Sequence, residues 1–227
     1  MPIKAVVLDV GGVLLLPHGS LVADRLEAAG IAFTPAYDEA HYRGVRALDR
    51  EASGPDPWGT YVDGYVAALG VRPEDRTQAR SELRPLWHGG EVDVWSFVVA
   101  TSVTGLEALR DRGVPLGIVS NSDGSVARRL VQHEICQVDE GPGVGVATVV
   151  DSGVVGVAKP DPAIFAFALE GLGLPADAVA YVGDSVTFDV VGARRAGLVP
   201  FHLDPYDLCE DASHRHLHRV ADVAEQL

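Results

Sequence analysis

Four short apolar runs recur along the chain, and they constrain its fold more than any other feature. Each run is followed by polar or glycine-rich residues and then by a helical pattern. The runs cover residues 4–8, 115–119, 147–150 and 178–182. Short apolar runs bounded by such residues are typical of strands buried on both faces of a sheet. Because strands that alternate with helices indicate parallel βαβ units, we predict an α/β fold with a three-layer, doubly wound parallel sheet.

The segment from residue 17 to residue 95 has helical periodicity and no convincing strand. Its clearest helix places apolar residues at helical spacing: Trp58, Tyr61, Val62, Tyr65, Val66 and Leu69. This spacing puts the residues on one face of a helix, which we expect to pack in the interior. Repeated glycine and proline residues indicate turns between short helices. We therefore predict an α/β core domain of residues 1–16 and 96–227, and an inserted helical domain of residues 17–95.

Polar residues stand where the predicted strands of the core end. They are Asp9, Ser120 with Asn121, Lys159, and Asp184 with Asp189. Taken singly, they would be ordinary residues that form a turn, cap a helix or face solvent. In doubly wound sheets, however, ligands bind at the carboxyl ends of the strands. The order of these residues along the chain therefore predicts a single site.

The chemistry of this predicted site points to phosphoryl transfer. A phosphoryl group and the Asp9 carboxylate are both anionic, so attack requires a cation between them. Asp9, Asp184 and Asp189 supply the oxygen ligands that Mg²⁺ accepts. Lys159 adds a second positive charge, and the Ser120 hydroxyl with nearby amides can donate to phosphate oxygens. In-line attack by Asp9 would then form an aspartyl phosphate, which divides one difficult step into two easier ones.

Four segments together resemble the motifs of the haloacid dehalogenase-like superfamily. They read DVGGV from Asp9, GIVSNSD over residues 117–123, VGVAKPDPAIF over residues 155–165 and YVGDSVTFDVVGA over residues 181–193. The core match covers residues 1–16 and 98–203. The resemblance implies that the helical insertion is a class one cap, which closes over the active site and selects the substrate.

The resemblance also implies roles for individual residues. Asp9, Ser120 and Lys159 would be catalytic, Ser120, Asn121 and Lys159 would bind the substrate, and Asp9, Gly11, Asp184 and Asp189 would bind Mg²⁺. Gly11 would contribute only its backbone carbonyl. The expected activity is magnesium-dependent hydrolysis of a small phosphorylated metabolite through an aspartyl phosphate on Asp9.

Gly11 departs from the family pattern, in which a second Asp usually stands at this position. Glycine keeps the metal-binding carbonyl but deletes the acid that protonates the leaving group. General acid catalysis contributes about 10² to 10⁴ in rate. We therefore expect a substrate with a good leaving group, such as a sugar 1-phosphate or an acyl phosphate. His18, His41 and Asp123 are weak candidates for a replacement acid, since polar side chains are usually just solvated.

Two other functions are compatible with the resemblance. Family dehalogenases attack carbon without a metal and also lack the second Asp, but they carry neutral residues where this chain has Asp184 and Asp189. Two extra carboxylates would repel an anionic nucleophile. The second alternative is a noncatalytic module that binds phosphoryl groups. The retention of Asp9 argues against it, because mere binding needs no nucleophile.

Phe188 is a second departure from the family pattern, because the family often has Asn just before the final acid. This departure weakens the assignment of Asp189 as a metal ligand.

Composition limits the partners and the location of the protein. The formal net charge of -14 opposes nonspecific binding to nucleic acid. No apolar run is long enough to cross a bilayer, so no membrane interaction is expected. The N-terminus lacks the pattern of a secretory signal, so we expect a cytoplasmic protein. The substrate's identity, the cap residues that contact it and the oligomeric state are left open by the sequence.

Cysteine and histidine residues suggest no second site. Cys136 and Cys209 lie far apart and match neither a thiolate zinc motif nor a disulfide framework, so we expect free thiols. His214, His216 and His218 alternate near the C-terminus. A metal site also needs supporting groups around its ligands. We therefore expect these histidines to lie in a solvated terminal segment.

Overall fold

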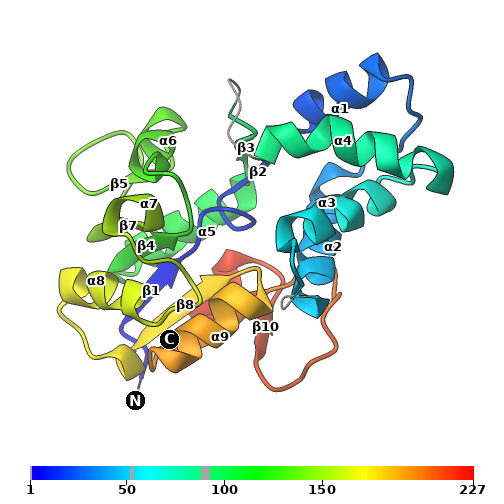
Figure 1. The fold of residues 1–227 in the computed structure, drawn as a ribbon. Coiled ribbons are helices and arrows are strands. Elements are labelled where there is room, and N and C mark those ends of the chain that lie inside the picture. The colour runs from blue at the N-terminus through cyan, green and yellow to red at the C-terminus, as the bar shows by residue number, and fades with distance from the viewer. Residues whose placement is uncertain (1, 52–53, 88–92) are drawn as a thin grey trace. The chain divides into compact units, whose positions relative to one another are not determined.

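The computed structural model describes residues 2–51, 54–87 and 93–227. Within it the chain forms two compact units (Figure 1). Unit 1 combines Met1–Leu14 with Val98–Leu227, and unit 2 consists of Leu15–Phe97. Unit 1 carries the strands of the main sheet, and unit 2 is mainly helical.

A six-stranded sheet forms the centre of unit 1, with the order β10-β9-β8-β1-β4-β7. Every strand pair described within it is parallel. The strands are β1 (Ala5–Leu8), β4 (Leu116–Ser120), β7 (Thr148–Asp151), β8 (Val179–Gly183), β9 (Val199–Leu203) and β10 (Arg215–Leu217). The predicted α/β fold with a parallel sheet is therefore confirmed.

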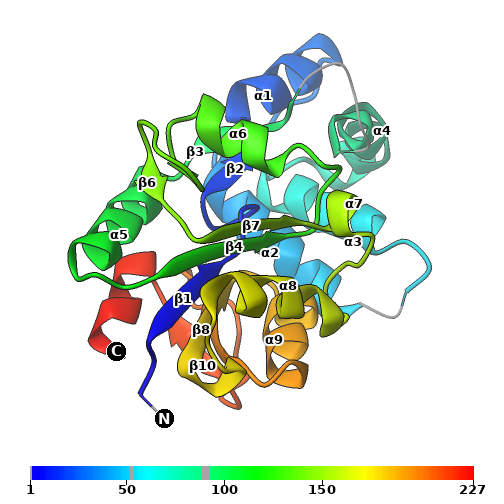
Figure 2. The same ribbon diagram turned by 90° about the vertical axis from the view of Figure 1, so that its left-hand side faces the viewer.

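Strand β1 lies in the middle of this sheet because all four of its residues are apolar and buried. Its register pairs Val6 with Leu116 of β4 and with Ala180 of β8. Helices cover both faces of the sheet (Figure 2): α8 (Ala163–Leu172) and α9 (Val191–Arg195) pack on one face, and α5 (Ala100–Asp111) lies on the other. The parallel arrangement brings the carboxyl ends of β1, β4 and β8 to one edge.

Strands β9 and β10 were not predicted from the sequence. Pro200 lies inside β9, and proline is unusual within a strand, so the apolar pattern there was easy to overlook. Shorter elements complete unit 1: α6 (Val126–Gln132), β5 (Cys136–Gln137), β6 (Val144–Gly145), α7 (Ser152–Val155), a π-helix at Val186–Val190, and 3₁₀ turns at Ala176–Ala178 and Val220–Glu225.

Four α-helices make up most of the described part of unit 2, where the sequence showed helical periodicity. They are α1 (Gly19–Ala28), α2 (Tyr37–Arg50), α3 (Pro57–Ala68) and α4 (Arg76–Trp87), with a 3₁₀ turn at Pro73–Asp75. Tyr61 and Tyr65 of α3 are buried, so this aromatic face is part of the unit's interior. The prediction that residues 17–95 contain no strand was wrong at the ends, because β2 (Leu15–Pro17) and β3 (Trp95–Val98) form a two-stranded sheet. Among the described residues, no helix combines the length and the apolar character needed to cross a membrane.

Candidate active site

Asp9 follows the last residue of β1 and is almost completely buried. Its backbone N–H donates to the Val182 carbonyl of β8 at 2.9 Å, which continues the strand pairing up to the site. Its Oδ1 accepts from the Val10 N–H at 2.7 Å, so one carboxylate oxygen is oriented by the loop. Burial raises the pKa of Asp9 to about 7; Lys159 opposes this rise, while Asp189 and Asp184 add to it.

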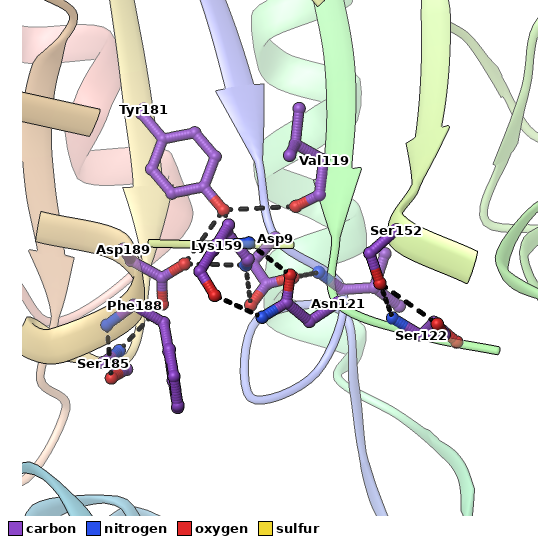
Figure 3. A network of polar contacts seen from close by, with 11 residues as sticks. Asp9, Val119, Asn121, Ser122, Ser152, Lys159, Tyr181, Ser185, Phe188 and Asp189 are labelled. Carbon is purple, nitrogen blue, oxygen red and sulfur yellow. Dashed lines mark hydrogen bonds and ion pairs between the residues drawn. The ribbon is translucent and has the colours of Figure 1, made fainter. Parts of the chain in front are cut away.

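Lys159 lies between two of the acids (Figure 3). Its Nζ is 2.7 Å from Asp9 Oδ2 and 2.7 Å from Asp189 Oδ1, and its side chain is only 1% exposed. Burial alone would lower the pKa of this ammonium group, but the carboxylates of Asp189 and Asp9 raise it above its ordinary value. Lys159 therefore remains charged in a site from which water is largely excluded.

Tyr181 of β8 joins the same network, although no sequence motif singled it out. Its hydroxyl accepts from Lys159 Nζ at 2.9 Å and lies within hydrogen-bonding distance of Asp189 Oδ1 (2.9 Å) and of the Val119 carbonyl (3.1 Å). Burial, followed by the charge of Asp189, raises the pKa of this phenol well above its ordinary value. Tyr181 therefore stays neutral and fixes the positions of Lys159 and Asp189.

Asp189 projects from the π-helix and uses both of its oxygens. Oδ1 receives Lys159 and Tyr181, and Oδ2 accepts from the Ser185 N–H at 3.0 Å. Gly183 makes room for this arrangement, because a Cβ at that position would lie 2.2 Å from Asp189 Cγ. The glycine of this segment is therefore a steric requirement for the buried carboxylate.

The loop after β4 holds Lys159 through the side chain of Asn121. Asn121 Nδ2 donates to the Lys159 carbonyl at 2.9 Å, and Asn121 Oδ1 accepts from the Lys159 N–H at 2.7 Å. The side-chain amide expected to bind substrate is thus engaged with the protein backbone. Ser120, the last residue of β4, is buried.

The carboxylate of Asp151, the last residue of β7, organises the same loop. Asp151 is buried and accepts hydrogen bonds from the backbone N–H groups of Gly124, Val126 and Gly153 at 2.9–3.0 Å. Such hydrogen bonds satisfy orphan donors at the starts of helices. Asp151 therefore fixes the loop that begins with Ser120 and Asn121.

Asp184 completes a cluster that fits a divalent cation. Carboxylate oxygens of Asp9, Asp184 and Asp189 lie within 4.8 Å of one another, and all three residues are buried. With all three ionised, Lys159 offsets only one of the three negative charges, and an uncompensated buried charge is costly. Oxygen-only ligands and excess negative charge are the conditions that favour Mg²⁺. The residues present therefore fit this ion.

Comparison with known proteins identifies the family of this chain. The family model for haloacid dehalogenase-like hydrolases matches residues 3–197. The chain belongs to the haloacid dehalogenase-like hydrolase family. It is accordingly a hydrolase, and the predicted family membership is confirmed.

Two relatives of known sequence match most of this chain. Haloacid dehalogenase-like hydrolase domain-containing protein 3 from Danio rerio is 37% identical, covering 91% of this chain and 87% of the relative. Glyceraldehyde 3-phosphate phosphatase from Methanopyrus kandleri is 28% identical, covering 87% and 82%.

Solved structures from the haloacid dehalogenase-like family share the fold at lower identity. The putative hydrolase YfnB from Bacillus subtilis, in a structure bound to magnesium, is 18% identical with a TM-score of 0.61, covering 99% of this chain and 98% of that one. A 2-haloacid dehalogenase from Pseudomonas syringae pv. Tomato DC3000 is 22% identical with a TM-score of 0.54, covering 98% and 97%.

The three weak candidates for a replacement acid have ordinary structural contacts. Asp123 accepts a hydrogen bond from the Ser125 hydroxyl, which lowers the pKa of its carboxyl. His41 is buried in unit 2, with Nδ1 3.0 Å from the Tyr61 hydroxyl, and His18 Nδ1 is 2.9 Å from the Ser20 hydroxyl. A lowered pKa makes Asp123 a poor proton donor at neutral pH.

Proposed function

We propose that this chain is a magnesium-dependent phosphatase that hydrolyses a small phosphorylated metabolite through an aspartyl phosphate on Asp9. The observation that carries the proposal is the position of Asp9, 2.7 Å from the buried Lys159 ammonium and clustered with Asp184 and Asp189. Mg²⁺ would be held by these three carboxylates and the Gly11 carbonyl, and it would offset the repulsion between Asp9 and the phosphoryl group. The phosphatase named among the relatives supports this reading.

In the first step, a carboxylate oxygen of Asp9 forms a bond to phosphorus while the bond from phosphorus to the leaving oxygen breaks. Asp9 Oδ1 accepts from the Val10 N–H and Oδ2 pairs with Lys159 Nζ at 2.7 Å, so the loop and the lysine together hold the carboxylate in place. Lys159 favours the ionised form of Asp9 and moderates the charge on the transferred group, and the Ser120 hydroxyl donates to a phosphoryl oxygen. In the second step, a water oxygen bonds to phosphorus while the bond from phosphorus to the Asp9 oxygen breaks; inorganic phosphate leaves with the protons of the water, and the Asp9 carboxylate is restored.

The pKa of Asp9 supports a phosphatase over a metal-free dehalogenase. Burial raises this pKa to about 7, and the carboxylates of Asp189 and Asp184 contribute to the rise. A dehalogenase must ionise its nucleophile without a divalent cation, so two adjacent acids would work against it. A phosphatase uses the same acids to bind the cation that lowers the pKa of its nucleophile.

The leaving group must depart without an acid at position 11. We propose that the preferred substrates are phosphates with good leaving groups, such as sugar 1-phosphates or acyl phosphates. Restoring the acid in Gly11→Asp should then raise turnover of ordinary phosphomonoesters more than turnover of these substrates. An unchanged preference in a folded variant would refute this account of substrate choice.

A panel of phosphorylated metabolites tests the proposed activity. Phosphate release should require Mg²⁺, stop when a chelator is added and be absent in Asp9→Asn, which preserves the shape of the side chain. Beryllium fluoride, which resembles the phosphoryl group, should bind the wild-type protein in the presence of Mg²⁺. Turnover of 2-haloacids in the presence of the chelator would establish the dehalogenase instead, and neither turnover nor fluoride binding would leave a noncatalytic module.

A further inference from the structure

A second group of metal-binding side chains gathers around the outer strands of the main sheet. His202 belongs to β9, His216 belongs to β10, and Cys209 and His214 lie in the connection between these strands. One ligand atom of each residue lies within 4.8 Å of those of the other three. The expectation of a solvated terminal segment was wrong for His214, whose side chain is 0% exposed.

Strand pairing brings these residues together from distant positions in the sequence. β9 and β10 are parallel, and their register places His202 directly beside His216. The connection folds back over this pair because the buried Asp204 carboxylate accepts from the N–H groups of Leu208 (2.9 Å) and Cys209 (2.8 Å). These hydrogen bonds fix the backbone at Cys209.

Hydrogen bonds to the backbone orient two of the imidazole rings. His202 Nε2 lies 2.9 Å from the Asp184 carbonyl, and His216 Nε2 lies 3.0 Å from the Asp211 carbonyl. Because a carbonyl oxygen only accepts, each Nε2 carries a hydrogen, and in the neutral ring Nδ1 has the lone pair. His216 Nδ1 also lies 3.6 Å from Asp204 Oδ2, a carboxylate that would attract a cation bound to this nitrogen. Backbone carbonyls that orient metal-binding histidines in this way are common around metal sites.

The third ring, that of His214, has a buried nitrogen without a hydrogen-bond partner in the described part of the chain. Its Nδ1 is buried without a hydrogen bond among the described residues and lies 3.5 Å from Asp211 Oδ2. A proton on Nδ1 suits this nearby carboxylate, and it leaves a lone pair on Nε2. His214 Nε2 is 3.1 Å from His202 Nδ1 and 3.9 Å from Cys209 Sγ, so lone pairs from separate side chains converge. A shared cation would resolve this convergence.

We propose that His202, Cys209, His214 and His216 bind one zinc ion through three imidazole nitrogens and one thiolate. Zinc bonds of about 2.0–2.1 Å to nitrogen and about 2.3 Å to sulfur place tetrahedral ligands about 3.3–3.6 Å apart. The observed separations of 3.1 and 3.9 Å lie on either side of this range. Three nitrogens and a sulfur suit zinc, whereas the oxygen cluster around Asp9 suits Mg²⁺.

The proposed zinc site is structural, because four protein ligands leave no open coordination position. It would tie β9, β10 and their connection together at the edge of the sheet. It would also fix the backbone at Asp184, whose carbonyl receives His202 Nε2. This inference is independent of the proposed phosphatase activity.

Cobalt substitution in the full chain, purified without a histidine tag and treated with a chelator, tests the site. One equivalent of Co²⁺ should give the intense visible bands of tetrahedral cobalt together with a near-ultraviolet thiolate band, and one equivalent of Zn²⁺ should remove both. Cys209→Ser should lose the thiolate band, and His214→Ala should weaken binding by more than about a hundredfold, beyond the 10- to 100-fold typical of merely orienting groups. Asp9→Asn should bind as the wild type does.

Matched variants control for general effects of substitution. Cys136→Ser alters the other buried thiol, and His218→Ala alters the neighbouring exposed histidine, whose side chain is 59% exposed. Both should keep the full cobalt spectrum. If the wild-type protein showed only weak octahedral cobalt bands and no thiolate band, the proposal would be overturned, whether or not the variants fold. Equal spectra for Cys209→Ser and Cys136→Ser would also overturn it, and His202 and His214 would then share only a hydrogen bond.

Discussion

Replacing Tyr181 by phenylalanine isolates the stabilising effect of the buried network. The substitution removes one hydroxyl and keeps the ring, which packs edge-on against Phe165 with centroids 4.9 Å apart. The lost oxygen contacts Lys159 Nζ, Asp189 Oδ1 and the Val119 carbonyl at 2.9–3.1 Å. Hydrogen bonds to charged groups contribute about 1.5–3 kcal/mol, and the two charged partners keep other contacts, so we expect a loss of about 2 kcal/mol.

This loss should be visible as a lower melting temperature of unit 1. For a domain of this size 1 kcal/mol corresponds to about 2–4 °C, so Tm should fall by about 4–8 °C. Differential scanning calorimetry measures the change, and it separates the transitions of the two units if they unfold independently. Because the hydroxyl positions Lys159, which is expected to act in both substrate binding and catalysis, kcat/KM should fall as well.

Tyr65→Phe is the matched control because it also removes a buried tyrosine hydroxyl, but one without hydrogen bonds among the described residues. Tyr65 is also 0% exposed, but its hydroxyl has no hydrogen bond within the part of the chain that the structure describes. Removing an unsatisfied buried oxygen should leave stability unchanged or raise it. If both substitutions lowered Tm equally, the contacts of Tyr181 would contribute nothing specific, and the reasoning would be refuted.

Two further predictions concern the acids of the site. Gly183→Ala should displace Asp189 and reduce both activity and Mg²⁺ affinity, because the added Cβ would lie 2.2 Å from Asp189 Cγ. Gly145→Ala is the control: a Cβ there meets nothing within 4 Å, so Mg²⁺ affinity and turnover should not change. Carboxyl NMR of the metal-free protein should show Asp9 titrating near pH 7, and Mg²⁺ should move the midpoint of this titration lower. Because the pKa is raised in the folded state, the folded protein binds more protons than the unfolded chain between about pH 4 and pH 7. The contribution of Asp9 to stability should therefore decrease as pH rises through this range. A metal-free midpoint near 4 would contradict the inferred desolvation.

The fold and the candidate nucleophile could be predicted because both depend on strands that are visible in the sequence. The ends of parallel strands meet at one edge, so Asp9 and Asp184 could be brought together by topology alone. Lys159 could be added through its place in a motif. The geometry of the buried contacts then followed from the structure: Lys159 lies 2.7 Å from both Asp9 and Asp189.

The contributions of Tyr181 and His202 could not be predicted in the same way. Tyr181 is an aromatic residue in an apolar strand, where a core position is the ordinary reading, and its partner Lys159 lies far away in sequence. His202 lies in a strand that contains a proline, and its neighbour His216 is defined only by the β9–β10 register. Long-range pairing determined both environments, and local residue patterns carry little information about such pairing.

The position of β1 has a consequence for how the protein folds during synthesis. This strand is made before the other strands of the main sheet, and its partners on both sides, β4 and β8, are made much later. Until they emerge from the ribosome, an apolar segment has no sheet to join, and contacts between distant residues form slowly. The segment that forms unit 2 is made between β1 and β4 and has its own buried interior, so the nascent chain exposes the apolar β1 strand for the whole time in which unit 2 is synthesised.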